Sequence, residues 1–215
     1  MPSNEILHSF RKIGIIPVVV LNKTEDALPL GEALCEGGLP TAEITFRTDA
    51  AEDSIRRMVH TFPDMLIGAG TVLNTEQVDR AIDAGAKFIV SPGLNLTVVK
   101  YCKEKNITVI PGIQTPTEIE MALTENIDTV KFFPAEMSGG LNMMKALAGP
   151  YTNISFIPTG GINASNVREY LKWDRIVACG GSWMVNQKML NTGNFEAIKS
   201  AAREASQIVK EVRGF

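Results

Sequence analysis

The chain has 215 residues, of which 45% are hydrophobic and 21% charged, and its formal net charge is −3. This balance is typical of a globular protein, and the length predicts a single domain over residues 1–215. The acidic charge argues against nucleic-acid binding, which usually needs a basic surface.

Short β-branched runs alternate with helical segments along the whole sequence. The runs end in Gly, Pro or polar residues, as expected for strands that are buried on both faces. Helix starts lie between them, among them Asn74-Thr-Glu-Gln77 and Thr115-Pro-Thr-Glu118, which offer capping side chains. The predicted strands are 14–21, 41–46, 65–71, 87–91, 107–111, 129–133, 154–159 and 175–180.

Strands that alternate with helices form βαβ units and a parallel sheet, and eight such units predict a (β/α)8 TIM barrel. The alternative is a doubly wound open sheet, which would need a glycine-rich turn after the first strand. The sequence there is Leu21-Asn-Lys-Thr-Glu25, which is not such a turn. We expect residues 1–12 to form an extra N-terminal helix across the barrel floor, and the chain to end in a long helix.

Lys131 lies inside the sixth predicted strand, in the run Thr129-Val-Lys-Phe-Phe-Pro134. A lysine is rarely buried without a partner, and on an edge strand it would extend to solvent instead. Since every strand of a closed barrel is internal, we expect Lys131 to face the barrel interior. A desolvated lysine can present a free amine that attacks a carbonyl, as Schiff-base catalysis requires.

The second predicted strand places Glu43, Thr45 and Arg47 on one face, because side chains alternate along a strand. A carboxylate and a guanidinium on one inward face can form a purely structural ion pair. The functional alternative complements Lys131. In that interpretation Glu43 moves protons, and Arg47 binds a substrate carboxylate through two hydrogen bonds.

Glycines mark three other strand ends. The third strand ends in Gly68-Ala-Gly-Thr71, whose threonine offers a hydroxyl at the rim. The last two end in Pro158-Thr-Gly-Gly-Ile162 and Cys179-Gly-Gly-Ser-Trp183. Loops after the seventh and eighth strands of many barrels bind phosphate through backbone N–H groups. The predicted phosphate-binding residues are Gly160, Gly161, Gly180, Gly181 and Ser182.

The cysteines and histidines do not suggest a metal site. Cys35, Cys102 and Cys179 include no CxxC pair, and only two histidines, His8 and His60, are present. We therefore expect no metal and no cofactor, and interpret Cys179 as a buried thiol and both histidines as surface residues. Reduced thiols and the lack of a long apolar run predict a cytoplasmic protein without membrane contact.

These motifs resemble those of the class I aldolases for 2-keto-3-deoxy-6-phosphogluconate (KDPG) and 4-hydroxy-2-oxoglutarate (KHG). The resemblance covers about residues 14 to 185, and the motifs fall in the family's order. The matching stretches are Gly14-Ile-Ile-Pro-Val-Val19, Glu43-Ile-Thr-Phe-Arg-Thr48, Gly68-Ala-Gly-Thr-Val-Leu73, Ser91-Pro-Gly93, Pro111-Gly-Ile113, Lys131-Phe-Phe-Pro-Ala-Glu136, Pro158-Thr-Gly-Gly-Ile162 and Gly180-Gly-Ser-Trp183.

The resemblance implies a (β/α)8 barrel that assembles as a homotrimer and takes a phosphorylated keto acid. It implies that Lys131 forms the Schiff base and that Glu43 is the acid/base. It places Arg47 and Thr71 at the pyruvyl carboxylate and the glycine pairs, with Ser182, at the phosphate. Other residues of the matching stretches that we predict to bind substrate are Pro92, Phe133 and Thr159.

Several alternatives remain open at this stage. An aldolase for 2-keto-3-deoxy-6-phosphogalactonate would use the same lysine and carboxylate and differ in one stereocentre. A preference for unphosphorylated KHG would leave the glycine pairs without their proposed role. A catalytically silent barrel that binds a phosphorylated metabolite would not need Lys131 near Glu43, and a phosphosugar isomerase or synthase would leave Lys131 unexplained.

Overall fold

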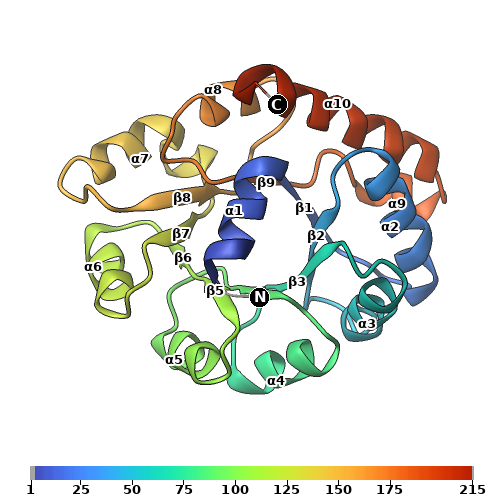
Figure 1. The fold of residues 1–215 in the computed structure, drawn as a ribbon, viewed down its shortest axis with the longest axis horizontal. Coiled ribbons are helices and arrows are strands. Elements are labelled where there is room, and N and C mark those ends of the chain that lie inside the picture. The colour runs from blue at the N-terminus through green and yellow to red at the C-terminus, as the bar shows by residue number, and fades with distance from the viewer. Residues whose placement is uncertain (1–2, 215) are drawn as a thin grey trace.

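The computed structural model describes residues 3–214, so residues 1, 2 and 215 of the predicted domain lie outside the described part. Parallel strands curl around a common centre, and helices lie outside them (Figure 1). The strands are β1 (Ile15–Val19), β2 (Thr41–Thr45), β3 (Leu66–Gly70), β4 (Phe88–Val90), β5 (Thr108–Ile110), β6 (Gly112–Ile113), β7 (Thr129–Phe132), β8 (Ser155–Pro158) and β9 (Cys179–Gly181).

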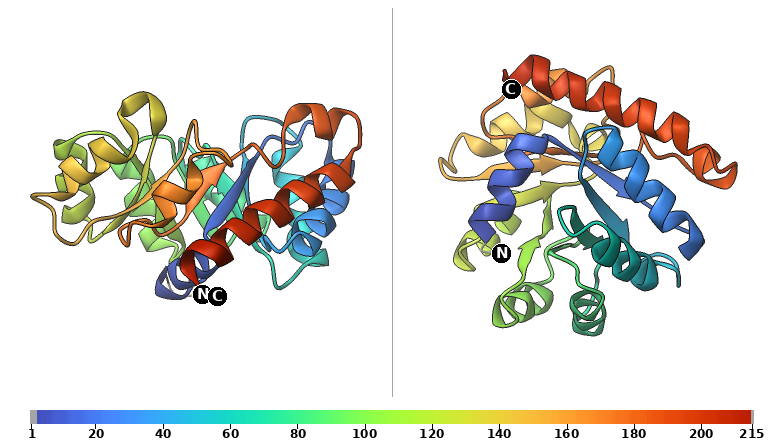
Figure 2. Two further views of the ribbon diagram at one scale, coloured as in Figure 1. Left: turned by 90° about the horizontal axis from the view of Figure 1, so that it is seen from above. Right: turned by 45° about the vertical axis from the view of Figure 1, so that its right-hand side comes forward.

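The helices follow the predicted alternation, and α10 runs along the outside against α2 and α8 (Figure 2). Asn74 caps α4 by accepting from the Gln77 N–H, and Thr115 and Glu118 form a capping box on α6. The α-helices are α1 (Ser3–Ile13), α2 (Ala27–Glu36), α3 (Ala51–Thr61), α4 (Thr75–Asp83), α5 (Leu96–Glu104), α6 (Pro116–Thr124), α7 (Gly140–Ala148), α8 (Val167–Leu171), α9 (Gln187–Asn191) and α10 (Phe195–Arg213). Short 3₁₀ turns are η1 (Thr24–Asp26) and η2 (Glu136–Ser138).

The strands pair as two parallel sheets that meet on both sides. One sheet has the order β5-β4-β3-β2-β1-β9 and the other the order β6-β7-β8. Only Pro111 separates β5 from β6, and its carbonyl accepts from the Lys131 N–H at 2.9 Å. On the other side, two isolated parallel bridges join the β8 segment to Ile176 and Gly180. The result is an α/β fold with a strongly curled parallel sheet.

Two strand predictions need correction. The run 107–111 was expected to be one complete strand, yet pairing resumes after it as β6. Pro111 has no N–H to donate, so it interrupts the ladder between the two parts. The run 175–180 was expected to pair throughout, but Ile176 makes a single bridge and the ladder covers Cys179–Gly181 instead.

Helix α1 lies across one end of the strands, as expected for the extra N-terminal helix (Figure 1). Its Ile6 and Phe10 are buried in a cluster with residues from the strand interior. The ring of Phe10 meets that of Phe88 edge to face, with centroids 4.9 Å apart. This end of the strand interior is therefore filled with apolar side chains.

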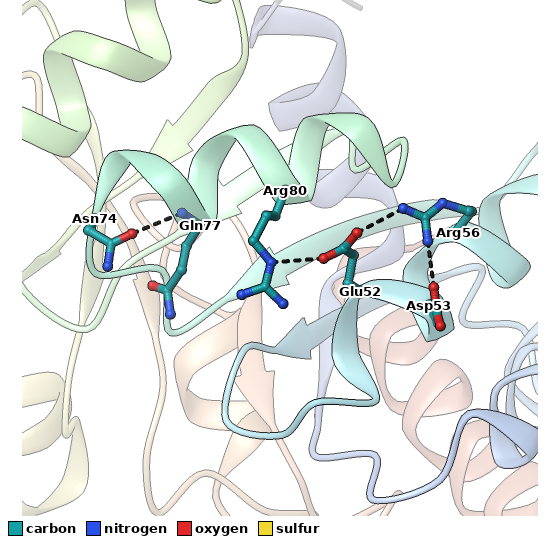
Figure 3. A network of polar contacts seen from close by, with 6 residues as sticks. All are labelled: Glu52, Asp53, Arg56, Asn74, Gln77 and Arg80. Atoms are coloured by element: carbon teal, nitrogen blue, oxygen red, sulfur yellow. Dashed lines mark hydrogen bonds and ion pairs between the residues drawn. The ribbon is translucent and has the colours of Figure 1, made fainter.

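An ion-pair network joins α3 to α4 on the outer surface (Figure 3). Glu52 accepts from Arg80 Nε and from Arg56 Nη2, each at 2.8 Å, and these bonds hold the pKa of the carboxyl below its usual value. The Arg80 guanidinium also lies 5.5 Å from the Phe46 ring centroid. Exposed pairs of this kind each contribute little to stability. Among the described residues, no helix is long and apolar enough to span a bilayer.

We predict that Phe10→Ala lowers the free energy of unfolding by about 3–5 kcal/mol, because it removes a fully buried ring and leaves a cavity. Urea denaturation measures this change. His8→Ala is the matched control, since His8 lies on the same helix and is exposed. If Phe10→Ala lowers the free energy of unfolding no more than His8→Ala does, the packing of α1 against the strands does not stabilise the fold.

Candidate active site

Lys131 and Glu43 meet inside the curled sheet. Lys131 Nζ donates to Glu43 Oε1 at 3.2 Å, and the two side chains are 7% and 5% exposed. On β7 the neighbours of Lys131, Val130 and Phe132, belong to the surrounding apolar core, so strand alternation turns the lysine toward the centre. The contact joins residues that are 88 positions apart in the sequence.

A glycine makes room for the carboxylate. Gly70, on the neighbouring β3, has no side chain, and a Cβ there would lie 2.2 Å from Glu43 Oε1. Any larger residue would therefore displace the carboxylate from its position against Lys131. The glycine at the end of β3 thus makes room for a protein side chain.

Arg47 lies just past the end of β2, where it is exposed. Its Nε donates to Thr45 Oγ1 at 3.2 Å, and Thr45 in turn donates to the Val19 carbonyl at 2.9 Å. Among the described residues no carboxylate pairs with Arg47, because Glu43 is engaged by Lys131. The purely structural ion pair between Glu43 and Arg47 is therefore absent from the described residues. The Arg47 guanidinium instead lines the cavity described next.

These residues line a cavity of about 290 Å³, which we call the lysine chamber. Thr71 lies at its edge with φ of +56°, a conformation that β-branched residues rarely adopt. Such strain is commonly found where a side chain is held for a function. The chamber is lined by Val18, Glu43, Thr45, Arg47, Thr71, Pro92, Lys131, Phe133 and Thr159.

A second cavity of about 370 Å³, the glycine chamber, adjoins the first. The two are continuous, since Val18, Arg47, Phe133 and Thr159 line both. The other residues of the glycine chamber are Val20, Gly160, Gly161, Ile162, Gly181, Ser182, Val185, Asn186 and Gln187. Arg47 supplies the only lysine or arginine charge in the lining of this chamber.

Unpaired hydrogen-bond donors gather at the glycine chamber. The Thr159 hydroxyl is buried and has no partner among the described residues. Within residues 3–214, no loop or turn hydrogen bond joins the backbone N–H of Gly161 or of Ser182 to a backbone carbonyl. Gly160 and Gly161 have φ of +100° and +82°, which L side chains rarely adopt. Neutral N–H and O–H donors in such a loop suit an oxyanion.

The structure thus brings the predicted site residues together, with one exception. Gly180 lines neither chamber, and a Cβ there would lie 2.3 Å from Thr159 Oγ1, so its missing side chain leaves room for that threonine. Sequence reasoning missed Gln187, which donates to the Val20 carbonyl at 2.7 Å and accepts from Asn22 at 2.9 Å. Only its position shortly after the second glycine pair could have indicated it.

The remaining reactive side chains lie away from the chambers. Cys102 and Cys179 are fully buried, and burial raises the pKa of each thiol to about 12. Burial and the nearby Asp64 raise the pKa of the half-buried Cys35 as well. His8 and His60 are exposed, as predicted. Within residues 3–214, no group of histidine, cysteine and carboxylate side chains is arranged to hold a metal ion.

Comparisons with known proteins find close similarity over most of the chain. The model of the KDPG and KHG aldolase family matches residues 6–201. A 2-dehydro-3-deoxy-phosphogluconate aldolase of Haemophilus influenzae is 48% identical, with 97% of this chain and 98% of the relative covered. A KHG/KDPG aldolase of Escherichia coli K12 is 41% identical, with 91% and 92% covered.

A solved structure is similar over nearly the whole fold. It is the KDPG aldolase of Legionella pneumophila, with a TM-score of 0.88 and 38% identity. The match covers 91% of this chain and 95% of the other. That structure holds pyruvate captured at low pH as a covalent carbinolamine intermediate.

We predict that iodoacetamide leaves Cys102 and Cys179 unmodified in the native protein at pH 8. A thiol with a pKa near 12 is ionised in about one molecule in ten thousand at that pH, and the thiolate is the nucleophile. Peptide mass spectrometry reads the labelled sites, and urea-unfolded protein, in which all three cysteines should react, is the control. Rapid native labelling of Cys179 would contradict its assignment as an inert thiol.

Proposed function

The chain belongs to the KDPG and KHG aldolase family, and from this premise we propose that it cleaves KDPG to pyruvate and glyceraldehyde 3-phosphate. It is a lyase, and the reaction proceeds through a Schiff base on Lys131. The single observation that carries this proposal is the buried contact of Lys131 Nζ with Glu43 Oε1 at 3.2 Å, in a cavity open to a substrate. An amine beside a carboxylate supplies both the nucleophile and the proton carrier that the reaction needs.

The reaction begins when the neutral amine of Lys131 attacks the C2 ketone. The resulting carbinolamine loses water and becomes a protonated imine, which withdraws electrons. Glu43, directly or through a water, removes the C4 hydroxyl proton, and the C3–C4 bond breaks as its electron pair moves toward the imine. Glyceraldehyde 3-phosphate leaves, and the enamine on Lys131 is protonated at C3. Water then hydrolyses the pyruvyl imine and releases pyruvate.

The lining of the lysine chamber suits the pyruvyl half of the substrate. The Arg47 guanidinium and the Thr71 hydroxyl bind its carboxylate, and Pro92 and Phe133 form apolar walls. The Phe133 ring centroid lies 5.4 Å from Lys131 Nζ, close enough to favour a positive charge on the nitrogen of the imine. The carbinolamine trapped in the Legionella relative supports the covalent route.

The glycine chamber suits the phosphate. Apart from the shared Arg47, its donors are neutral and lie in the Gly160–Gly161 loop and around Gly181, Ser182 and Thr159. Phosphate contacts far from the breaking bond provide binding energy that orients the substrate over Lys131. Unphosphorylated KHG, split to pyruvate and glyoxylate, is a second substrate, because the E. coli relative is named for both activities. The galactonate-type aldolase and the silent phosphate-binding barrel remain the alternatives.

We further propose that the two sheets close as one (β/α)8 barrel over residues 3–214. On one side Pro111, between β5 and β6, accepts from the Lys131 N–H, and on the other side isolated bridges join the β8 segment to Ile176 and Gly180. A cytoplasmic homotrimer is the proposed working form. Its support is the exposed apolar surface, where Met137 is 88% exposed and Phe133 and Met143 lie nearby in the chain. The three free cysteines suit a reducing compartment.

Borohydride reduction in the presence of pyruvate tests the proposed function. We expect the wild-type protein to gain one reduced pyruvyl group on Lys131, located by peptide mass spectrometry, and Lys131→Ala to gain none. Glu43→Gln should still form the adduct, but its KDPG cleavage should fall by about 10²- to 10⁴-fold, since it loses the acid/base group.

Circular dichroism of each variant is the folding control, because Lys131→Ala leaves Glu43 buried without its partner. If pyruvate binds and no adduct forms on the wild-type protein, the aldolase proposal is wrong. The silent phosphate-binding barrel would then be the better description. Comparing cleavage of the gluconate and galactonate epimers identifies the stereochemical preference.

Gly70→Ala tests the packing that positions Glu43. We predict that its methyl group displaces the carboxylate and lowers kcat for KDPG by about 10²-fold, since catalytic groups tolerate misplacement poorly. The matched control is Gly93→Ala at the same rim, where a Cβ would have no neighbour within 4 Å. Equal activity of both variants would contradict the role assigned to the Gly70 position.

A further inference from the structure

Glu136 is part of the stretch that begins at Lys131, yet it lines neither chamber. It begins η2, directly after the turn that leaves β7. In this turn the Ala135 N–H donates to the Thr159 carbonyl at 2.8 Å, and the Glu136 N–H donates to the Gly160 carbonyl at 3.1 Å. The backbone at Glu136 therefore holds the loop that carries the first glycine pair.

The side chain of Glu136 supports the same loop from outside the chambers. A Cβ added to Gly161 would lie 2.6 Å from both Cβ and Cγ of Glu136, so the loop rests directly on this side chain. Gly161 also has its carbonyl fixed, because Asn163 Nδ2 and Asn166 Nδ2 donate to it at 3.1 and 3.0 Å. The loop is thus held by amides on one side and by Glu136 on the other.

Tyr170, on α8, determines where the Glu136 carboxylate lies. Its hydroxyl donates to Glu136 Oε1, and the tyrosine is only 3% exposed. Burial, and then the hydrogen bond to Glu136, raises the pKa of this hydroxyl, so it remains a donor at neutral and moderately alkaline pH. Gly140 leaves room for the pair, since a Cβ there would lie 2.8 Å from Tyr170 Oη and 3.1 Å from Glu136 Oε1.

We propose that Glu136 and Tyr170 form a positioning pair that fixes the Gly160–Gly161 loop for the substrate phosphate. This inference rests on the proposed function. The lining of the glycine chamber contains no lysine, and its only arginine is Arg47, which it shares with the lysine chamber. Phosphate affinity therefore depends on how well the neutral donors are oriented. Backbone N–H groups in a loop keep their orientation toward the phosphate only if the loop is rigid. A small displacement of the loop lengthens or misaligns its hydrogen bonds to the phosphate, and these weaken steeply. The pair also keeps an acidic group turned toward Tyr170 instead of toward the phosphate.

The test uses Tyr170→Phe, which removes the donor and keeps the ring. We expect KM for KDPG to rise by about three- to tenfold with kcat unchanged, since one hydrogen bond is lost and the loop is less well held. Borohydride trapping of pyruvate on Lys131 should show an unchanged dependence on pyruvate concentration, because that half of the substrate carries no phosphate. KM for KHG should likewise stay the same.

Two further sets of variants separate positioning from general stability. Tyr151→Phe is the matched control, because Tyr151 also donates to a glutamate, Glu120, at 2.8 Å but lies on another part of the surface. It should leave every parameter unchanged. Glu136 is exposed, so Glu136→Ala should fold and repeat the KM effect, whereas Glu136→Gln, whose amide oxygen still accepts from Tyr170, should restore most of the affinity.

The outcomes distinguish this inference from the proposed function. A wild-type protein that neither traps pyruvate nor cleaves KDPG overturns both. A wild-type protein that does both, with Tyr170→Phe and Glu136→Ala matching it in KM, overturns the positioning pair alone. An equal rise of KM for KDPG and for the unphosphorylated substrate also overturns it, since the loss is then not specific to phosphate.

Discussion

The active site depends on bringing a lysine and a glutamate together in the interior of the fold. A buried ionisable side chain is costly unless it is paired, and removing one partner of a buried pair costs about 3–5 kcal/mol. Lys131 and Glu43 come from β7 and β2, which belong to different sheets, so only the curl of the strands lets them meet. Gly70 then leaves the space that the carboxylate occupies. The Lys131–Glu43 contact therefore requires both the curl of the strands and the absence of a side chain at Gly70.

The two ends of the strand interior differ in how they are filled. At one end α1 covers the strands, and Ile6, Phe10 and Phe88 fill the space with apolar side chains. At the other end the chambers remain open, and the buried Thr159 hydroxyl that lines them has no partner among the described residues. Unpaired polar groups lower stability, so the filled floor compensates for an end that is kept free for a ligand.

Most of the strands and most of the candidate site residues could be predicted from the sequence. Both follow from the alternation of strands with helices, from the alternation of side chains along a strand, and from where the strands end. The sequence located Lys131 and Glu43 since a charged residue in an otherwise apolar strand has few explanations. It could not foresee that pairing resumes beyond Pro111 as β6, because this depends on the neighbouring β7, or that the missing side chain of Gly180 leaves room for Thr159. The contact of Tyr170 with Glu136 was beyond sequence reasoning too, because it joins residues 34 positions apart through tertiary packing.

The distribution of charge between the chambers affects how an elongated substrate with an anionic group at each end would be oriented. Arg47 lines both chambers, so its single charge lies between the groups that would hold a carboxylate and those that would hold a phosphate. A second cation in the glycine chamber would attract either anionic end and permit reversed binding. Neutral donors on a loop discriminate by geometry instead, since a tetrahedral phosphate and a planar carboxylate place their oxygens differently. A site built in this way gains orientation from rigidity, which is why the packing behind the Gly160–Gly161 loop matters as much as the donors on it.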